Sequence, residues 1–239
     1  MSNRFRSIAI VTFTILFANS VNAQEKKDDP VERVRLAAAR VKSQNNLKQI
    51  ALAFHIMADE KKGILPSDIT DKNGKPLLSW RVAILPYLEQ QNLFKQFRLD
   101  EAWDSDNNKK LLEKMPTIYA APLGTFEKGH TVYQSFSGID TVMSGKPVKI
   151  FTIPDGTSNT FMVIEAGDAV PWTKPADVAF DTKKPLPKLG GIFDGAFNVA
   201  MCDGSVRFIP KGVKTENLKK YITMSEGTPG SDDDFKPAK

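Results

Sequence analysis

One uninterrupted stretch, PVERVRLAAARVKSQNNLKQIALAFHIMADEKKG at residues 30–63, constrains the fold of this chain more than any other. Apolar residues recur in it every three or four positions, which is the period of one helix face. Pro30 suits a first helical position, and Gly63 suits the position just past the end. The stretch predicts one helix of about thirty residues, roughly 45 Å long. Its apolar positions are Val34, Ala37, Ala38 and Val41, then Leu47, Ile50, Ala51, Phe54 and Met57.

The two halves of this predicted helix offer different apolar surfaces. The polar run KSQNN at residues 42–46 separates the two sets, so the second stripe is rotated around the axis from the first. The second half is more apolar, and we expect it to pack on the body of the protein. The first half carries only a thin stripe, which a partner helix or a membrane surface could cover. The helix therefore indicates a protein partner or self-association.

From about residue 117 onward, the sequence consists of short segments rich in β-branched and aromatic residues. Gly, Pro, Asp and Asn separate them, which is typical of antiparallel strands. The segments are TVYQSF (131–136), VKIFTI (148–153), TFMVIEA (160–166), GAFNVAMC (195–202) and SVRFI (205–209). Helices followed by strands favour an α+β fold. We predict a long N-terminal helix packed on an antiparallel β-sheet, with short additional helices.

Turn signals divide the rest of the chain. Asn-Gly at the centre of DKNGKP (71–76) predicts a hairpin, and Ser79 can cap a short helix that follows. Near the C-terminus, Asp203-Gly204 predicts a tight hairpin between strands Ala196–Cys202 and Ser205–Ile209.

The N-terminus has the features of a secretory signal peptide. Two arginines precede an apolar run at residues 8–18, and the small residues of Val21-Asn22-Ala23 predict cleavage before Gln24. That run is shorter than the roughly 20 residues that a membrane span needs. We predict a signal peptide (1–23), a linker (24–29), one domain (30–224) and a disordered tail (225–239). The protein is then exported to a periplasmic, cell-envelope or extracellular location, without an integral span after cleavage; a retained N-terminal anchor is the alternative.

Charge and cysteine content exclude some classes of protein. The formal net charge is +5, and the basic residues are scattered among acidic ones, which does not favour nucleic acid as a partner. The single cysteine, Cys202, permits no internal disulfide, and its position within a predicted strand indicates a buried, inert thiol. His55 on the long helix and His130 in a predicted loop lack neighbours with metal-ligand spacing. We therefore expect no enzyme.

An acidic cluster is the best candidate for ion binding. Asp100, Glu101, Asp104 and Asp106 supply hard oxygen ligands that could hold Ca²⁺. The EF-hand pattern fails, however, because Lys109 and Met115 stand where it needs Gly and Glu. The alternative is a helix N-terminus, where acids cap free N–H groups. No other cofactor is predicted.

Aromatic residues offer a second candidate site. Trp80, Trp103 and Trp172 could line a groove for saccharides or peptides, because indole rings stack on apolar faces and still donate an N–H. Core filling is the alternative. Trp172 lies in a Pro-rich segment, and we expect it to be the most exposed of the three.

Several stretches resemble a known family. They are RLAAARVKSQNNLKQIALAFH, LLSWRVAILPYLEQ, AWDSDNNKKLLEKMP, PDGTSNTFMVIEA, AVPWTKP and NVAMCDGSVRFI, spread over most of residues 30–210. In this order they resemble the bacterial exported domain-of-unknown-function family 1559, whose domain is also labelled solute-binding-protein-like. Many members look like type IV pilins or pseudopilins, so the resemblance implies a pilin-like fold. It also implies a structural signature role for Asp155, Gly156, Asp203 and Gly204.

This sequence departs from the family pattern twice. Its N-terminus lacks a prepilin leader, which argues against assembly into a pilus-like fibre. Phe193 stands ten positions before Asp203, where the family's C-terminal signature has a histidine. The residues and the resemblance together predict a non-enzymatic, pilin-like structural or protein-interaction module of the cell envelope. An extracytoplasmic protein that binds saccharides or peptides is the alternative.

Overall fold

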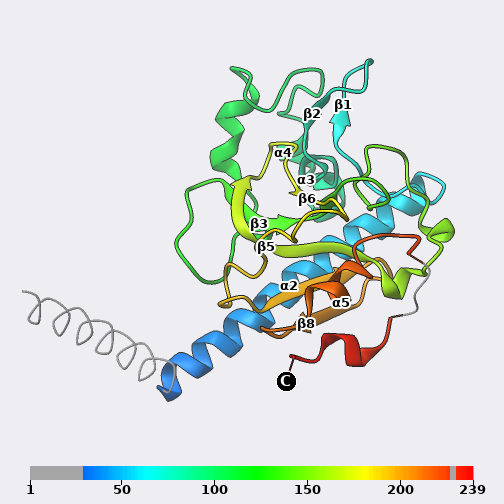
Figure 1. The fold of residues 1–239 in the computed structure, drawn as a ribbon. Helices are drawn as coiled ribbons and strands as arrows, with labels where there is room; N and C mark the ends of the chain where they lie inside the picture. The colour runs from blue at the N-terminus through cyan, green and yellow to red at the C-terminus, as the bar shows by residue number, and fades with distance from the viewer. Residues whose placement is uncertain (1–28, 227–229, 239) are drawn as a thin grey trace, which may run out of the picture. The chain divides into compact units, whose positions relative to one another are not determined.

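The computed structural model describes residues 29–226 and 230–238 (Figure 1). The predicted signal peptide, its cleavage site and residues 24–28 of the linker lie outside these residues. The chain divides into two compact units, residues 1–41 and 42–239. The first helix, α2, spans Pro30–Glu60, which confirms the prediction of one long helix. Within the described residues, no helix combines the length and the apolar character needed to cross a membrane.

The described part of the first unit, residues 29–41, is the beginning of α2. The carboxylate of Asp29 accepts a hydrogen bond from the N–H of Val31 at 2.9 Å, and its carbonyl accepts one from Arg33 at 3.0 Å. Glu32 and Arg35 follow one turn apart, 3.7 Å from each other. Asp29 therefore starts the helix, with Pro30 as its first residue, as predicted.

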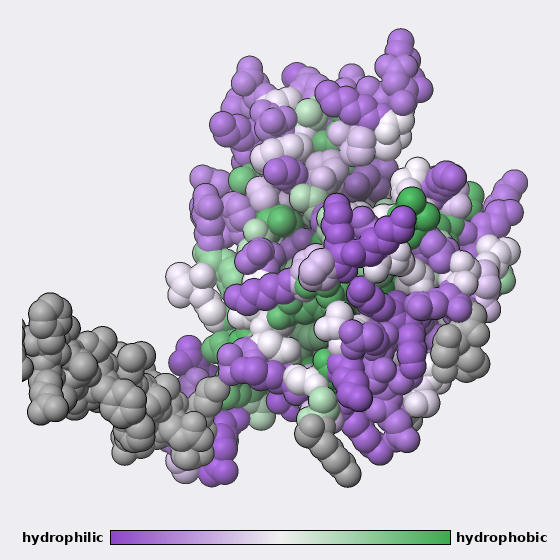
Figure 2. Space-filling view, viewed as in Figure 1, coloured by the Kyte–Doolittle hydropathy of each residue, from purple (hydrophilic) through white to green (hydrophobic). Residues whose placement is uncertain are grey.

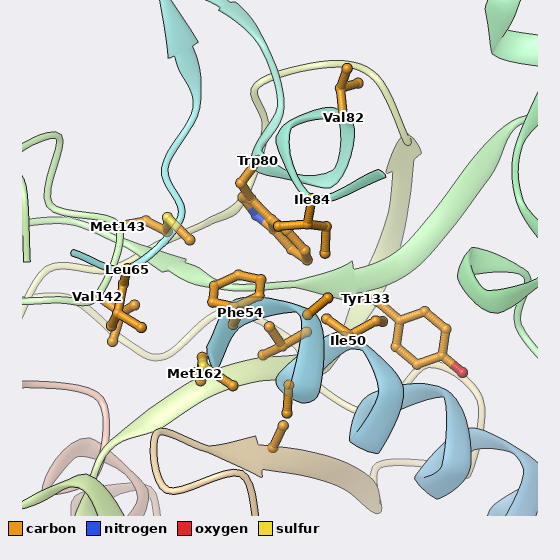
Figure 3. Close-up of a cluster of buried hydrophobic side chains, with 14 of the residues drawn as sticks. Ile50, Phe54, Leu65, Trp80, Val82, Ile84, Tyr133, Val142, Met143 and Met162 are labelled. Atoms are coloured by element: carbon orange, nitrogen blue, oxygen red, sulfur yellow. The ribbon is translucent and has the colours of Figure 1, made fainter. Parts of the chain in front are cut away.

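In the second unit, the remainder of α2 buries the predicted apolar stripe. Leu47, Ile50 and Phe54 are fully buried, and the ring of Phe54 meets that of Trp80 edge-on with centroids 5.0 Å apart. Figure 3 shows the ring of Phe54 directed towards Trp80, in the same buried cluster as Ile50, Tyr133 and Met162. The helix ends where the N–H of Gly63 donates to the carbonyl of Ala58, and Gly63 adopts a φ of +86°.

A four-stranded antiparallel sheet in the order β3-β5-β7-β8 forms the centre of the second unit. Its two faces carry separate apolar clusters, because residues alternate between the faces along each strand. On β7, for example, Ala200 belongs to the cluster that contains α2, and Val199 belongs to the other. The α+β prediction is therefore confirmed. The strands are β3 (His130–Gln134), β5 (Phe161–Pro171), β7 (Phe197–Met201) and β8 (Val206–Ile209).

Short elements surround this sheet. Most lie between α2 and β3, where Ser79 caps α3 as predicted, its hydroxyl accepting from the N–H of Arg81. One small pair, β4 with β6, is parallel. The short elements are β1 (Ile69–Thr70), β2 (Pro76–Leu78), α3 (Trp80–Ala83), η1 (Leu85–Leu88), α4 (Gln91–Phe94), η2 (Asn108–Lys114), η3 (Thr117–Tyr119), β4 (Phe136–Ser137), η4 (Ile150–Thr152), η5 (Thr157–Asn159), β6 (Val178–Ala179), α5 (Thr215–Lys219) and η6 (Asp232–Phe235).

The segment VKIFTI at residues 148–153 was predicted as a strand, and the structure corrects this. It pairs with the chain after α2 only through the single bridge Ile64–Lys149, and a 3₁₀ turn begins at Ile150. The N–H of Ile150 donates to the carbonyl of Gly63 at 2.9 Å. A β-rich composition therefore gives no strand here, because no neighbouring strand extends beyond that bridge.

The tail also differs from its prediction. Residues 230–238, the part of the tail beyond residue 226 that the structure describes, contain η6 instead of disordered chain. The ring of Phe235 packs on Tyr221 with centroids 4.6 Å apart, and Lys220 pairs with Asp234 at 3.1 Å. These and further contacts to Phe161 and Arg207 hold a segment whose polar composition indicates disorder.

The hairpin between β7 and β8 is confirmed, with one change in its loop. Met201 closes the loop by donating its N–H to the carbonyl of Ser205 at 2.8 Å. The loop therefore has three residues, Cys202-Asp203-Gly204, and not the two predicted. Gly204 has a φ of +84°, whereas Asp203 is not among the residues with positive φ. A turn followed by one left-handed glycine is the usual form of a three-residue hairpin loop.

Candidate functional site

The predicted acidic cluster does not form an ion site in the structure. Among residues 29–226 and 230–238, no group of three or more His, Cys, Asp or Glu side chains is placed to hold a metal ion. Asp100, Asp104 and Asp106 are exposed, and Glu101 pairs with Arg98 at 2.8 Å, which lowers the pKa of Glu101. These carboxylates therefore do not converge on one site for a metal ion.

The amide of Asn108 organises this loop from inside. Its Nδ2 donates to the carbonyls of Arg98 at 2.9 Å and of Glu101 and Ala102 at 3.1 Å, and its Oδ1 accepts from the N–H of Arg98 at 3.0 Å. Asn108 is fully buried. The loop is thus shaped by the hydrogen bonds between one buried amide and the backbone.

The three tryptophans do not line one groove. Trp80 and Trp172 are fully buried, so the prediction that Trp172 is the most exposed is wrong. Its Nε1 donates to the carbonyl of Leu112 at 3.0 Å, and its ring stacks on Tyr119 at 5.8 Å. Trp103 is half-buried, with Lys174 5.4 Å from its ring centre. The alternative of core filling describes Trp80 and Trp172.

The thiol and the histidines show no catalytic arrangement. Cys202 is fully buried, and burial raises the pKa of its thiol well above the ordinary value. A protonated, inaccessible thiol is a poor nucleophile. His130 begins β3, and does not lie in a loop as predicted. His55 has its Nε2 buried, without a hydrogen-bond partner among the described residues, and a Cβ added to Gly204 would lie 3.4 Å from this atom.

The two Asp-Gly signatures lie next to each other in the fold. The N–H of Cys202 donates to the carbonyl of Thr160 at 2.8 Å, and the N–H of Asp203 donates to that of Thr157 at 3.0 Å. Gly156 and Gly204 both have positive φ, at +87° and +84°. The motifs PDGTSNT and CDGS therefore meet through backbone hydrogen bonds, and their glycines allow the turns.

A buried polar cluster joins α2 to the sheet, and the sequence prediction missed it. The Ser43 hydroxyl donates to the Glu165 carboxylate and lies 2.8 Å from the Tyr133 hydroxyl. Glu165 also accepts from the N–H of Asn198 at 2.6 Å. Ser43, Glu165 and Asn198 are fully buried, and burial raises the pKa of Tyr133 to about 12. We call Ser43, Tyr133, Glu165 and Asn198 the helix–sheet cluster.

This cluster uses residues from three of the stretches that carry the family resemblance. Ser43 comes from KSQNN, Glu165 from MVIEA and Asn198 from NVAMCDG. Asn46 adds a bond from its Nδ2 to the Tyr133 hydroxyl at 3.2 Å, and Gln44 donates to Asn198 Oδ1 at 3.2 Å. The sequence could have indicated this cluster, because its polar residues stand within segments whose pattern is otherwise apolar. Several donors surround this buried carboxyl group, so the cluster fastens the helix to the sheet.

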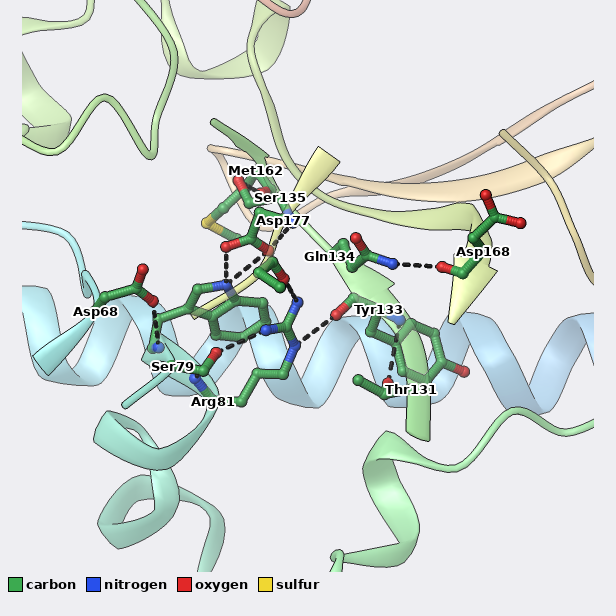
Figure 4. A network of polar contacts seen from close by, with 12 residues as sticks. Asp68, Ser79, Arg81, Thr131, Tyr133, Gln134, Ser135, Met162, Asp168 and Asp177 are labelled. Carbon is green, nitrogen blue, oxygen red and sulfur yellow. Dashed lines mark hydrogen bonds and ion pairs between the residues drawn. The ribbon is translucent and has the colours of Figure 1, made fainter. Parts of the chain in front are cut away.

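A second buried cluster contains an ion pair, shown in Figure 4. Nη2 of Arg81 lies 2.8 Å from Oδ1 of Asp177, and both side chains are almost wholly buried. Asp177 also accepts from Trp80 Nε1 at 3.1 Å and from the N–H of Ser135 at 2.8 Å. Arg81 uses its Nε on the carbonyl of Tyr133 at 2.8 Å. The pair therefore ties α3 to β3 and to the segment before β6.

Asp68 adds a second carboxylate beside this ion pair. Its Oδ1 accepts from the N–H of Trp80 at 2.9 Å. Burial, together with the nearby charge of Asp177, raises the pKa of Asp68 to about 6. Two carboxylates with different environments resemble an acid–base pair. Asp177 is fully engaged by its donors, however, so the arrangement is that of a structural cluster.

Comparison with protein families identifies part of the chain. Residues 32–127 match the family described as "Protein of unknown function (DUF1559)". This segment is similar to that family. The match confirms the family resemblance, and the DUF1559 segment contains Ser43, Trp80 and Arg81. Their partners Glu165, Asn198 and Asp177 lie beyond residue 127. Searches of curated proteins and of solved structures find no match.

Proposed function

We propose that this chain is an exported, non-enzymatic, pilin-like module of the cell envelope, with a structural or protein-interaction role. In this proposal, it meets a partner or a second copy through the N-terminal part of α2. The secretory character of residues 1–23 supports export. The buried thiol and the two fully engaged polar clusters support a structural use of the groups that could otherwise act in catalysis.

The observation that carries the proposal is an exposed apolar stripe within residues 30–41. Val31, Val34 and Val41 are 74%, 70% and 56% exposed, and Ala38 between them is exposed as well. These four positions follow a spacing of three, four and three, which is the seam of a coiled coil. β-Branched valines on an exposed helix face lower helix propensity slightly, so their use there favours a packing role.

The size of the stripe bears on the kind of partner. Burial of three valines against another helix contributes on the order of a few kcal/mol, which supports weak or multivalent association. Arg33 and Arg35 are exposed on the same segment, and Arg35 lies near Glu32. A partner helix with an apolar seam and acidic flanks would complement this surface.

The alternative, binding of a saccharide or peptide, has less support. It relied on Trp80, Trp103 and Trp172, two of which are fully buried. Trp103 is the one tryptophan of the three that is left, and by itself it cannot form the predicted groove.

Sedimentation and crosslinking over a range of concentrations test the proposal. The wild type is expected to show a concentration-dependent species larger than a monomer, or to retain a specific envelope protein on a column. The double variant Val34→Glu/Val41→Glu should lose this behaviour. Ile139→Glu/Phe151→Glu, which adds the same charge at other exposed apolar side chains, should keep it. A wild type that stays monomeric and retains nothing would contradict the proposal.

A further inference from the structure

The apolar stripe at the start of α2 has a distinct pattern of charge beside it. Single exposed apolar residues are ordinary, and Figure 2 shows several small green patches among hydrophilic side chains on one face. The stripe differs because its members repeat along one side of a helix. Val31 and Ala38 occupy position a of a heptad repeat, and Val34 and Val41 occupy position d. The residues at the neighbouring positions therefore bear on what can cover the stripe.

The positions that flank the stripe are basic on one side and uncharged on the other. In a heptad repeat, e and g lie on either side of the seam formed by a and d. Arg35 and Lys42 occupy e, whereas Pro30 and Ala37 occupy g. The Arg35 side chain is 68% exposed, and Lys42 is exposed as well. A helix that covers the stripe therefore meets two cationic side chains along one of its edges.

The two carboxylates of the same segment stand at other heptad positions. Asp29, at f, accepts a hydrogen bond from the N–H of Val31 at 2.9 Å and so serves the start of the helix. Glu32, at b, lies 3.7 Å from Arg35. An ion pair this long between exposed side chains contributes little, so Arg35 can exchange Glu32 for a carboxylate of a partner. Positions e and g carry no acidic residue between Pro30 and Lys42.

A second copy of this chain would not supply the missing acidic groups. In a parallel pair of helices, position e faces position g of the partner, so Arg35 would meet Pro30 and Lys42 would meet Ala37. In an antiparallel pair, e faces e, so the basic side chains of the two copies would face and repel one another. Neither arrangement forms an ion pair across the stripe. The charge pattern therefore disfavours self-association through this face.

We propose that the apolar stripe of α2 binds an amphipathic helix of a different protein, which carries Asp or Glu at the positions that face Arg35 and Lys42. This inference rests on the proposed function and chooses between the two kinds of partner that it allows. The occupant is argued from charge complementarity, because charges beside the seam set partner choice in coiled coils.

Two synthetic peptides test the proposal against the exported chain, whose N-terminus is first established by mass spectrometry. Both peptides have the same Leu residues at a and d, and they differ only in having Glu or Lys at e and g. Fluorescence anisotropy measures their binding. The wild type should bind the Glu peptide about tenfold or more tightly than the Lys peptide, and added salt should reduce this difference.

Charge reversal on α2 provides the matched comparison. Arg35→Glu/Lys42→Glu should reverse the preference in favour of the Lys peptide. Lys109→Glu/Lys110→Glu on η2 makes the same change in net charge elsewhere and should keep the wild-type preference. Thermal melting and helix content check that these exposed substitutions leave the fold intact. Absence of binding, equal binding of the two peptides, or an unchanged preference in Arg35→Glu/Lys42→Glu would each overturn the proposal.

Sedimentation separates this inference from the proposed function. The wild type alone should sediment as a monomer at concentrations where its mixture with Arg35→Glu/Lys42→Glu forms a heterodimer, because an antiparallel pair then places opposite charges at e. A wild-type dimer that Val34→Glu/Val41→Glu abolishes would overturn the inference and leave the proposed function standing. No association in any sample, together with no binding of either peptide, would contradict both.

Discussion

The hydroxyl of Ser43 on α2 donates a hydrogen bond to the carboxylate of Glu165 on β5, across a sequence separation of 122. Both side chains are fully buried. A carboxyl group in a protein interior is tolerated only when its oxygens are hydrogen-bonded. The contact therefore makes the docking of this part of α2 depend on one specific alignment of helix and sheet.

Ser43→Ala should destabilise the protein by about 2–3 kcal/mol, because it leaves a buried carboxylate short of one donor. Urea denaturation gives the free energy of unfolding. Ser67→Ala, at an exposed serine, is the control and should change it by less than about 0.5 kcal/mol. The two substitutions would have equal effects if the helix–sheet cluster contributed nothing.

Asp177→Asn should have a larger effect. It removes the countercharge of the buried Arg81, and loss of one partner of such a pair costs about 3–5 kcal/mol. The free energy of unfolding should fall accordingly, with the spectrum of the folded state retained. Glu113→Gln is the control, since the Lys128–Glu113 pair is exposed and its loss should be undetectable. An unchanged Asp177→Asn variant would show that the ion pair does not stabilise the fold.

Asp68 should make stability depend on pH. Its pKa is about 6 in the folded protein, above the ordinary 3.8, so the folded state binds a proton more tightly than the unfolded state does. This stabilisation is complete below the unfolded pKa and is lost as the pH rises through the folded pKa. Between about pH 4 and about pH 7, the wild type should lose on the order of 1–2 kcal/mol more than Asp68→Asn does. Parallel stability curves for the two proteins would contradict the raised pKa.

Gly204→Val should destabilise the closing hairpin. The left-handed φ of +84° is strained for a branched residue, and a Cβ there would lie 3.4 Å from His55 Nε2. Gly74→Val is a matched control, because Gly74 has a φ of +82° and nothing within 4 Å of its added Cβ. The melting temperature should fall more for Gly204→Val.

Cys202→Ala should keep any association or binding that the wild type shows. Loss of that association or binding with an unchanged melting temperature would contradict a structural role for this residue.

Local patterns in the sequence predicted the elements that depend on local chemistry. The helix from Pro30, its buried stripe, the Ser79 cap and both hairpins follow from periodicity, capping and turn residues. The family resemblance rested on motifs such as SQNN and DGTSNT, and the family match covers residues 32–127, which contain SQNN but not DGTSNT. These features involve residues close in sequence, or one repeated period.

The errors and omissions involve residues that are far apart in the chain. Nothing near Trp172 in sequence indicates that Tyr119 and Leu112 enclose it. Similarly, residues 230–238 of the tail are anchored by an aromatic contact between Phe235 and Tyr221. Glu165 stands in a hydrophobic run, which signals a buried polar group, but its partner Ser43 could not be identified from spacing. Long-range pairs decide these details, and one sequence does not encode them in a local pattern.

Photo-crosslinking at the apolar stripe of α2 tests the central claim most directly. A photoreactive residue would replace Val34 or Val41 in the exported chain, and Arg33 in a control that lies one position away on another side of the helix. The account predicts a product of one defined mass, either the dimer or one envelope protein, from positions 34 and 41 and much less from 33. Equal labelling at all three positions, or no product from 34 and 41, would contradict it.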